Sequence, residues 1–541
     1  MTHITLFTFT ITLIPLLCVC YDQKPQYHIT PDDGHWLNDP NGPMYYNGYY
    51  HLFFQYNPHA PVWGDMSWAH VVSTDMVYWQ RLNVALYNDQ WYDIGGVFSG
   101  SAAINNSSPY LLYTCVDSNG VELQCAASRD ASSTTYDTTL EDWVKDVKNP
   151  VINSVPSGWD IYNFRDPALF TTNQEEQWNM LTAASDNGDG IIALHTTSAQ
   201  DFPYGWTYKN PVWRSSDPAS THQSFMVECP DFFPVDSDVY EVNTDQVYIM
   251  KYSVMETTQD FYEVGRYVSD SDTSADVFTR DLTTPADLQL DYGPHRAFYA
   301  SKSFYDAGSN TRFLWGWSME QDDQGESRGW QGVQSLPRTV SYDPDMQSLR
   351  LRPYSKLSSL RSATVYSSLS PPISGDIPAT GLQVEVQAEF TISAACNVFD
   401  LEGAEMGMQV RRSSDGQYFT SYGFALGVSE SAEIMVFTSM DSSVSGGSTP
   451  PEKLYTPVPT IAFQNISDNG DIVLSMQLFL DHSITEMFAQ DGALAATLRI
   501  YPEESYNGMG TYVFGGNYSG NADCFVGATA ITVYEMGTIW Q

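Results

Sequence analysis

Three short segments in the first half of the chain place a carboxylate beside proline or an aromatic side chain. They cover residues 36–42, 164–167 and 228–231 and contain Asp39, Asp166 and Glu228. Partial burial and a fixed backbone can tune the pKa of such a carboxyl group, as acid–base catalysis requires. A single Asp-Pro pair usually marks a turn or a strand end. Three such segments in a chain rich in aromatic residues and poor in Lys and Arg predict a carboxylate active site.

The elements that position these carboxylates are predicted to be β-strands. Short alternating apolar runs bounded by Gly, Asn, Asp and Pro recur between residues 36 and 351, for example at 49–55, 168–172, 246–252 and 312–317. Regularly spaced short strands are typical of a sandwich, a barrel or a propeller. Only residues 141–148 resemble a turn of helix in this part of the chain.

The second part of the chain is predicted to be a separate domain. A stretch rich in Ser and Pro at 355–380 is interpreted as a linker, and alternation resumes at 383–392, 471–480 and 529–535, which indicates a β-sandwich. A chain of 541 residues is too long for one ordinary core. We therefore expect one domain over 21–354 and a second over 381–541.

The composition narrows the class of ligand. With 65 acidic and 24 basic side chains the formal charge is −41, which argues against nucleic acid and anionic membrane surfaces as partners. An apolar fraction of 42% can still bury a large core. The abundant aromatic side chains suit a β-rich protein that handles a neutral, hydroxyl-bearing ligand.

Other kinds of site lack support in the sequence. No His-Glu-x-x-His, paired Cys-x-x-Cys or Gly-x-x-x-x-Gly-Lys occurs, so no metal site and no cofactor is predicted. Residues 481–483 read Asp-His-Ser, the residue types of a catalytic triad. Neighbours in a strand point to alternating faces, so these three cannot relay a proton.

The amino terminus predicts secretion. Residues 4–19 are largely apolar but shorter than the ~20 residues that span a bilayer. No Lys or Arg precedes them, which is unusual for a signal peptide, yet we expect a signal over 1–20. No later stretch is long enough to span a membrane. Acceptor triplets for N-glycosylation agree with secretion, at Asn105, Asn106, Asn465 and Asn517.

The cysteines predict one disulfide. Seven become five if the signal is removed, so at least one stays unpaired. Cys115 and Cys125 flank a hairpin, but pairing about a turn at 117–120 sets Cys115 opposite Glu122 and Cys125 opposite Leu112. The two thiols would then be too far apart to bond.

We expect the bridge to join Cys396 and Cys524, which share the C-terminal region.

The three acidic segments resemble the signature motifs of the glycoside hydrolase family 32 β-fructosidases, which include invertases, fructan hydrolases and fructosyltransferases. The motifs are Asn-Asp-Pro-Asn-Gly at 38–42, Phe-Arg-Asp-Pro at 164–167 and Glu-Cys-Pro at 228–230. The likeness continues in order through 99–102, 298–306, 329–332, 336–338, 481–484 and 486. It covers nearly all of the mature chain and is closest to plant-type acid invertases.

The resemblance implies an all-β fold, a five-bladed β-propeller followed by a β-sandwich. Five blades in the first domain leave roughly 66 residues for each blade. Asp39 and Asp166 are 127 positions apart, close to two blades, and Asp166 and Glu228 are 62 apart, close to one. The three carboxylates would then occupy equivalent places on different blades and converge at the centre.

The resemblance also implies catalytic roles. Asp39 matches the nucleophile, Glu228 the acid/base and Asp166 the residue that stabilises the transition state. A retaining enzyme needs the first two about 5 Å apart, with Glu228 protonated at the start. Arg165 beside Asp166 could hold a nearby carboxylate ionised.

The substrate-binding residues carry over by the same matching. Asn38, Gln55 and Ser99 are expected to bind hydroxyl groups, and Trp36, Trp63 and Phe98 to form apolar walls. Leu37 and Arg165 complete the expected set. Core packing is the alternative reading for each. Residues 63–65 read Trp-Gly-Asp, where plant invertases commonly have Trp-Gly-Asn.

The expected function is that of a secreted, retaining β-fructofuranosidase acting on terminal non-reducing fructosyl units of sucrose and fructans. The alternatives are a fructan exohydrolase, a fructosyltransferase or, more distantly, a sugar-binding protein without activity. Sucrose-preferring plant relatives often carry an Asp-x-x-Lys pair that steadies the tryptophan at the glucosyl unit. Met255 and Thr258 take the places of that pair here. We therefore expect activity on fructans beside sucrose.

Overall fold

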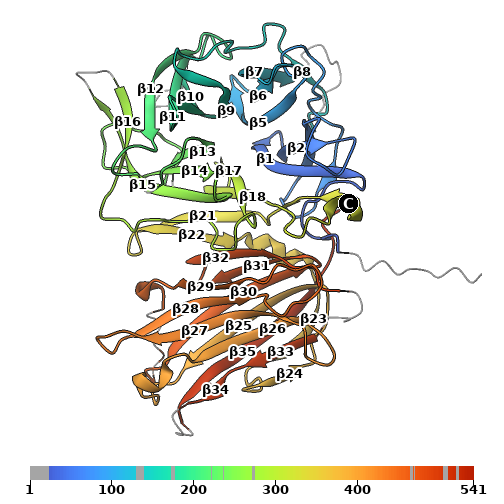
Figure 1. Cartoon of the computed structure of the whole chain (residues 1–541), viewed down its shortest axis with the longest axis vertical. Coiled ribbons are helices and arrows are strands. Elements are labelled where there is room, and N and C mark those ends of the chain that lie inside the picture. Colours follow the sequence, from blue (N-terminus) through green and yellow to red (C-terminus); the bar gives the residue numbers. More distant parts are fainter. Residues whose placement is uncertain are drawn as a thin grey trace, which may run out of the picture.

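The structure is a computed structural model. It describes residues 23–540 except 130–138, 172–176, 221, 236, 271–274, 464–466, 468, 504–509 and 519–522. The expected signal at 1–20 and the acceptor Asn465 lie outside the described residues. Nearly all regular structure is β-strand, and Figure 1 shows a ring of small sheets above two larger packed sheets. The predicted all-β fold, a five-bladed β-propeller followed by a β-sandwich, is confirmed.

The propeller is built from five antiparallel sheets. Blade 1 contains β1 (His35–Tyr46), β2 (Tyr49–Asn57), β3 (Ser67–Ser73) and β4 (Gln80–Arg81). Blade 2 contains β5 (Gly96–Asn105), β6 (Ser108–Val116), β7 (Glu122–Arg129) and β8 (Trp143–Lys145). Blade 3 contains β9 (Trp159–Thr171), β10 (Gln177–Asp186), β11 (Asp189–Ser198) and β12 (Thr207–Arg214). Blade 4 contains β13 (Val227–Pro234), β14 (Tyr248–Val254), β15 (Gln259–Asp270) and β16 (Ala275–Arg280).

Blade 5 closes the ring. It contains β17 (Tyr299–Asp306), β18 (Thr311–Ser318), β20 (Val333–Gln334), β21 (Arg338–Asp343) and β22 (Ser348–Pro353). The short helix α1 (Gly325–Arg328) leads into β19 (Trp330–Gln331), which pairs in parallel with β1 of blade 1. The inner strands β1, β5, β9, β13 and β17 each contact the next around the ring. Closure leaves no inner strand without neighbours.

Each inner strand has a bulge near the centre at which it carries one extra residue relative to the strand it pairs with. The pairing skips between Leu37 and Pro40 in β1, Phe98 and Gly100 in β5, Arg165 and Ala168 in β9, Glu228 and Asp231 in β13, and Tyr299 and Lys302 in β17. Asp166, Cys229 and Ala300 at these bulges have positive φ angles of 64°, 46° and 52°. A β-bulge re-aims the side chains next to it. The predicted catalytic carboxylates all lie at these bulges.

The second domain is a sandwich of a seven-stranded and a six-stranded sheet. The first contains β23 (Arg361–Ser368), β35 (Phe525–Met536), β25 (Gln383–Ile392), β30 (Ile472–Asp481), β31 (Ile484–Ala489), β32 (Leu494–Arg499) and β34 (Gly516–Asn517). The second contains β24 (Gly375–Ile377), β33 (Gly510–Phe514), β26 (Glu405–Arg412), β27 (Thr420–Val428), β28 (Ile434–Asp441) and β29 (Lys453–Pro457). Inward-facing residues such as Phe390, Tyr422 and Leu474 form one buried core between them.

Two sequence predictions fail at edge strands. The expected linker at 355–380 contains a 3-10 turn at Ser355–Leu360, the edge strand β23, which pairs with β35, and β24, which pairs with β33. The expected helical turn at 141–148 contains β8, which pairs with β7. Most side chains of β23 are exposed or half-buried. Such strands lack the apolar alternation that identifies strands in a sequence. Two further 3-10 turns lie at Val398–Leu401 and Thr460–Phe463.

The two domains meet around buried charges. His28 contacts Asp481 through Nδ1 at 2.8 Å and Glu486 through Nε2 at 3.1 Å. Arg338 of blade 5 donates to Glu486 at 2.6 Å and to Asp291 at 2.9 Å. Asp481 therefore belongs to the contact between the domains, in agreement with the prediction that residues 481–483 form no catalytic triad.

The segments near both ends of the described chain also lie together. The Ile539 N–H donates to the Gln26 carbonyl at 3.2 Å, and the Trp79 N–H donates to the Ile539 carbonyl at 2.8 Å. The guanidinium of Arg81 lies 3.6 Å from the centre of the Trp540 ring. No helix of the described residues is long and apolar enough to cross a membrane.

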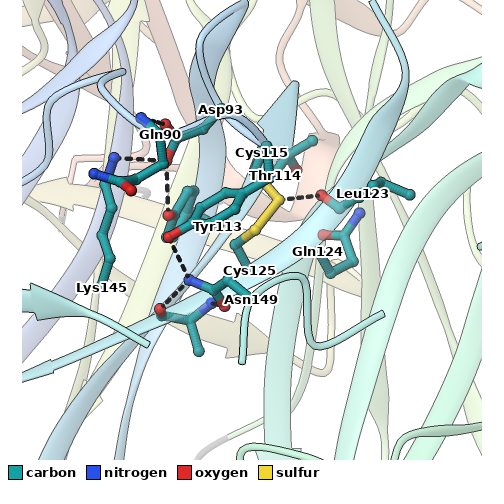
Figure 2. Close-up of a disulfide and its surroundings, with 12 residues drawn as sticks. Gln90, Asp93, Tyr113, Thr114, Cys115, Leu123, Gln124, Cys125, Lys145 and Asn149 are labelled. Carbon is teal, nitrogen blue, oxygen red and sulfur yellow. Dashed lines mark hydrogen bonds and ion pairs between the residues drawn. A yellow bond between two sulfur atoms is a disulfide. The ribbon is translucent and has the colours of Figure 1, made fainter. Parts of the chain in front are cut away.

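The disulfide prediction is half right. Cys396 and Cys524 are bonded as expected, with Cα atoms 4.4 Å apart, and Cys229 is buried and unpaired. Cys115 and Cys125 are also bonded, with Cα atoms 5.8 Å apart (Figure 2). This corrects the prediction that excluded them.

The cause of that error is the register of the hairpin. Val116 pairs with Glu122, so the loop has five residues rather than the four expected, and Cys115 lies opposite Leu123. A slip of one residue moves a side chain to the other face of the sheet. In the observed register both thiols share one face.

Candidate active site

The three predicted carboxylates converge at the centre of the propeller from three blades. Asp39 comes from β1, Asp166 from β9 and Glu228 from β13. The Cys229 N–H, next to Glu228 in the chain, donates to Asp166 Oδ2 at 2.8 Å, and Cys229 Sγ lies 3.6 Å from Asp39 Oδ2. Cys229, at the bulge of β13, thus contacts both Asp166 and Asp39.

Asp39 is held by neutral donors. Its Oδ2 accepts from Ser99 Oγ at 2.5 Å and from Gln55 Nε2 at 3.1 Å, while Oδ1 accepts from Asn38 Nδ2 at 3.2 Å. Burial raises the pKa of Asp39, the Ser99 hydrogen bond opposes this rise, and the charge of Glu228 adds to it. The three donors orient the carboxylate and favour its ionised form, as a nucleophile requires.

Asp166 has a different environment. Its N–H donates to Thr114 Oγ1 at 2.8 Å, which holds the left-handed backbone of the bulge, and its carboxylate accepts the Cys229 N–H. Burial raises the pKa of Asp166 to about 7, with Arg165 opposing and Glu228 adding to the rise.

Glu228 is contacted from two sides. Arg165 donates to its Oε1 through Nε at 3.0 Å, and its Nη2 lies 3.0 Å from the same oxygen. The Tyr299 hydroxyl donates to Oε2. Arg165 therefore contacts a predicted catalytic carboxylate on the neighbouring blade, Glu228. Both partners can stabilise Glu228 after it has given up a proton.

Most of the predicted substrate-binding residues gather around these carboxylates. Trp36 Nε1 donates to Asn38 Oδ1 at 2.8 Å, and Gln55 Nε2 donates to Ser99 Oγ at 2.5 Å. The rings of Trp63 and Phe98 meet edge to face with centroids 5.9 Å apart, and Trp63 is 58% exposed.

Leu37 does not join this group. Its side chain is fully buried in the hydrophobic core of the propeller. Alternation along β1 sends its side chain to the face opposite those of its two neighbours. The Leu37 side chain therefore does not line the centre, and its predicted part in substrate binding stays a prediction.

Several residues of the centre were missed from the sequence. The largest omissions are Glu122, which binds Arg165 through both carboxylate oxygens, and Tyr299. Lys251 and Asp260 support two bulges from below, because Lys251 Nζ donates to the Cys229 carbonyl and Asp260 accepts from the Ser301 N–H. Lys251 Nζ also donates to the Ser301 carbonyl of blade 5 at 2.8 Å, so each of these residues makes a contact between blades. Such contacts have no signature of their own in the sequence. Within the described ranges, no cluster of His, Cys, Asp and Glu is arranged to hold a metal ion.

A closed propeller with buried carboxylates converging at its centre, joined to a β-sandwich, is the architecture of a glycoside hydrolase. The chain belongs to glycosyl hydrolases family 32, because the family's N-terminal domain matches residues 28–353 and its C-terminal domain matches residues 345–532.

Similar proteins agree with this assignment. The acid beta-fructofuranosidase of Phaseolus vulgaris is 34% identical over 96% of this chain and 80% of its own length. The fructan 6-exohydrolase of Triticum aestivum is 33% identical over 90% of this chain and 86% of its own length. The crystal structure of fructan 1-exohydrolase IIa from Cichorium intybus superposes with a TM-score of 0.78 at 27% identity and covers 95% of this chain and 98% of that one. A variant of the Cichorium enzyme was solved in complex with 1-kestose.

Proposed function

We propose that the protein is a secreted, retaining β-fructofuranosidase that removes terminal non-reducing β-D-fructofuranosyl units by double displacement. The observation that carries the proposal is that two carboxyl groups at the centre, those of Asp39 and Glu228, have different hydrogen-bonding partners. Asp39 is held by three donors that favour its ionised form, while Glu228 lies between Arg165 and Tyr299. One group suits a nucleophile and the other an acid that becomes a base.

The reaction then runs in two steps. In the first, Glu228 gives its proton to the glycosidic oxygen while Asp39 Oδ bonds to the anomeric carbon, and the alcohol leaves. In the second, ionised Glu228 takes a proton from water, the water oxygen bonds to the anomeric carbon, and the Asp39 ester breaks to release fructose. Arg165 and Tyr299 stabilise Glu228 between the steps.

Asp166 is proposed to bind fructosyl hydroxyl groups. A carboxyl group that keeps its proton near neutrality can donate one hydrogen bond and accept others, which matches adjacent hydroxyls.

The pH dependence of the rate tests the two-carboxylate mechanism. The profile of kcat/KM should be bell-shaped with an optimum of roughly pH 4 to 6, its acid limb set by ionisation of Asp39 and its alkaline limb by Glu228. The apparent values belong to the coupled set of carboxylates. An optimum above about pH 8 would contradict the mechanism.

The substrate range is proposed to include fructans beside sucrose. Trp63 is largely exposed, and Phe98 is its aromatic neighbour. Met255 directs its sulfur to Arg165 Nη2 at 3.2 Å, and Thr258 lies in the same turn, so neither supplies a charge. The nearby Glu256 accepts from Ser224 Oγ at 2.9 Å. A loosely held tryptophan would grip a glucosyl unit weakly.

Competition kinetics with sucrose, 1-kestose, inulin and levan test this range, and product identification separates hydrolysis from fructosyl transfer. A lost contact is typically worth ~1 to 3 kcal/mol of discrimination. We expect fructans to be cleaved within about 100-fold of sucrose. Cleavage of fructans about a thousandfold slower, near 4 kcal/mol of barrier, would contradict the proposal. Absence of cleavage of any fructoside would favour a binding protein.

Secretion is proposed on two grounds. The two disulfides suit an oxidising compartment. Relatives include a vacuolar acid beta-fructofuranosidase and an insoluble isoenzyme of Arabidopsis thaliana. Glycosylation would support it further, and the structure separates the two overlapping acceptors. Asn105 donates to the Ala199 carbonyl at 3.3 Å and accepts from Trp178 Nε1 at 3.2 Å, whereas Asn106 is exposed in the hairpin turn.

Peptide mass spectrometry of protein secreted from a eukaryotic host tests the choice of acceptor. Ser107→Ala destroys only the Asn105 triplet, and Ser108→Ala destroys only the Asn106 triplet. We expect the glycan to persist in the first variant and to vanish in the second. Retention inside the cell without a glycan would contradict secretion.

A further inference from the structure

The hairpin of β6 and β7 in blade 2 holds the catalytic segment of blade 3. The Thr114 hydroxyl accepts the Asp166 N–H at 2.8 Å, and Gln124 Nε2 donates to the Phe164 carbonyl at 2.8 Å. The Glu122 carboxylate accepts the Phe164 N–H at 2.7 Å. Three side chains of one hairpin thus fix the backbone on both sides of Arg165.

Glu122 also binds the Arg165 side chain directly. Arg165 Nη1 lies 3.1 and 3.2 Å from the two Glu122 oxygens, while its Nε and Nη2 contact Glu228 Oε1 at 3.0 Å. Glu122 is only 4% exposed. The guanidinium is therefore a buried bridge between two carboxylates, one outside the reaction and one inside it.

The disulfide fixes the geometry of this hairpin from the other face. Thr114 pairs directly with Gln124, and Cys115 and Cys125 are their neighbours along the two strands. Because successive side chains alternate, both cysteines lie on the face of the hairpin opposite to that of Thr114 and Gln124. The cross-link holds the register that brings Thr114, Glu122 and Gln124 to one face.

We propose that Glu122 is a positioning residue for the reaction, which holds Arg165 against Glu228 and neutralises part of the positive charge of Arg165. This inference rests on the proposed function, with Glu228 as the acid. No sequence motif and no resemblance assigned a role to Glu122.

The charges around Glu228 set the expected sign. It faces Arg165 and Asp166 from β9, Tyr299 from β17 and Asp39 from β1, with Glu122 of β7 on the far side of Arg165. Replacing the Glu122 carboxylate by an amide removes a negative charge and leaves the shape. Arg165 keeps its contacts with Asn163 Oδ1 at 3.1 Å and with Glu228. Its full charge would then favour ionised Glu228.

The test is the pH profile of kcat/KM for sucrose in the full-length Glu122→Gln enzyme. We expect the alkaline limb to move about one pH unit lower, which is a tenfold loss of activity on that limb, while the acid limb stays in place. Glu122→Asp keeps the charge and should restore most of the alkaline limb. It also keeps the inference testable if the amide variant does not fold.

Glu263→Gln is the matched control. Glu263 of β15 is a buried carboxylate that accepts from Trp213 Nε1 at 3.2 Å and from the Tyr252 hydroxyl at 3.1 Å, in blade 4. Its variant should leave both limbs in place. An equal fall at every pH in Glu122→Gln, or an unshifted alkaline limb, would overturn the positioning role. An inactive wild-type enzyme would instead overturn the proposed function.

Discussion

Two clusters of buried carboxylates lie in this molecule, and they are stabilised in opposite ways. At the propeller centre, Asp39 and Asp166 are held by hydroxyl, amide and backbone N–H donors. At the contact between the domains, Glu486 is held by Arg338 and His28. Among the described residues neither Asp39 nor Asp166 forms an ion pair, whereas Glu486 is paired with Arg338.

The pKa values follow this difference. Burial raises the pKa of Asp39 and of Asp166, and for both the other carboxylates add to the rise. Burial also opposes ionisation of Glu486, but Arg338 and His28 outweigh it and lower its pKa. Asp291, which shares Arg338, is the exception, because burial wins and its pKa is raised. The carboxyl groups proposed to react are thus separate from those that join the domains.

The largest expected effect comes from the centre. Asp39→Asn and Glu228→Gln should each lower kcat by several powers of ten, each power worth about 1.4 kcal/mol of barrier, because each removes a reacting group. Neither should lower the melting temperature much, since each replaces a carboxyl group by an amide of nearly the same size. Steady-state kinetics and thermal unfolding measure the two effects.

Glu228→Gln should retain more activity on substrates with good leaving groups, which need less proton donation. Near-normal activity of either purified variant on sucrose would show that Asp39 and Glu228 are not the reacting carboxyl groups.

The next effect comes from the domain contact. Arg338→Met should lower the free energy of unfolding by about 3 to 5 kcal/mol, because it leaves Glu486 and Asp291 buried without their cation. The folded fraction should keep its kcat. Urea unfolding measures the loss, and Arg338→Met combined with Glu486→Gln should recover part of it. A large change in kcat at unchanged stability would contradict the view that the carboxylates at the domain contact stabilise the fold and do not take part in the reaction.

The smallest effect is a pH dependence with opposite signs at two histidines. Burial opposes protonation of His28, but hydrogen bonds to Asp481 and Glu486 outweigh it and raise its pKa above the ordinary value of 6.5. Its stabilising contribution is therefore complete below about pH 6.5 and is lost as the pH rises through the folded value. His28→Gln should cost on the order of 1 kcal/mol more at pH 5 than at pH 8 in urea unfolding.

His195 supplies the contrast. Burial lowers the pKa of His195 to about 4. As the pH falls below about 6.5, this histidine is therefore protonated in the unfolded chain but not in the folded one, which lowers the stability of the folded protein. His195→Gln should therefore cost less at pH 5 than at pH 8. Equal signs for the two histidines would show that the paired and unpaired environments do not differ as described.

The convergence of the three carboxylates and the fold were predictable, because local motifs carry the first and strand alternation with family resemblance carries the second. The residues that support them were not. Glu122 lies 43 positions from Arg165, and Tyr299 lies 71 from Glu228, so only the packing of blades brings them together. The Cys115–Cys125 bond was not predicted, because the hairpin loop is one residue longer than assumed. Edge strand β23 was mistaken for a linker because none of its side chains is fully buried, so its sequence lacks alternating apolar residues.

The hydrogen bond between Ile539 and Gln26 means that the order in which the strands follow one another along the chain could be changed without changing their arrangement in space. Since the segments near both ends of the described chain share one patch, a short linker could join them and the chain could be reopened elsewhere. The exposed turn at Asn187 and Gly188, between β10 and β11, is a suitable opening. Such a circular permutant would keep β19 paired with β1 and all five bulges in register, while blade 3 would carry the new ends.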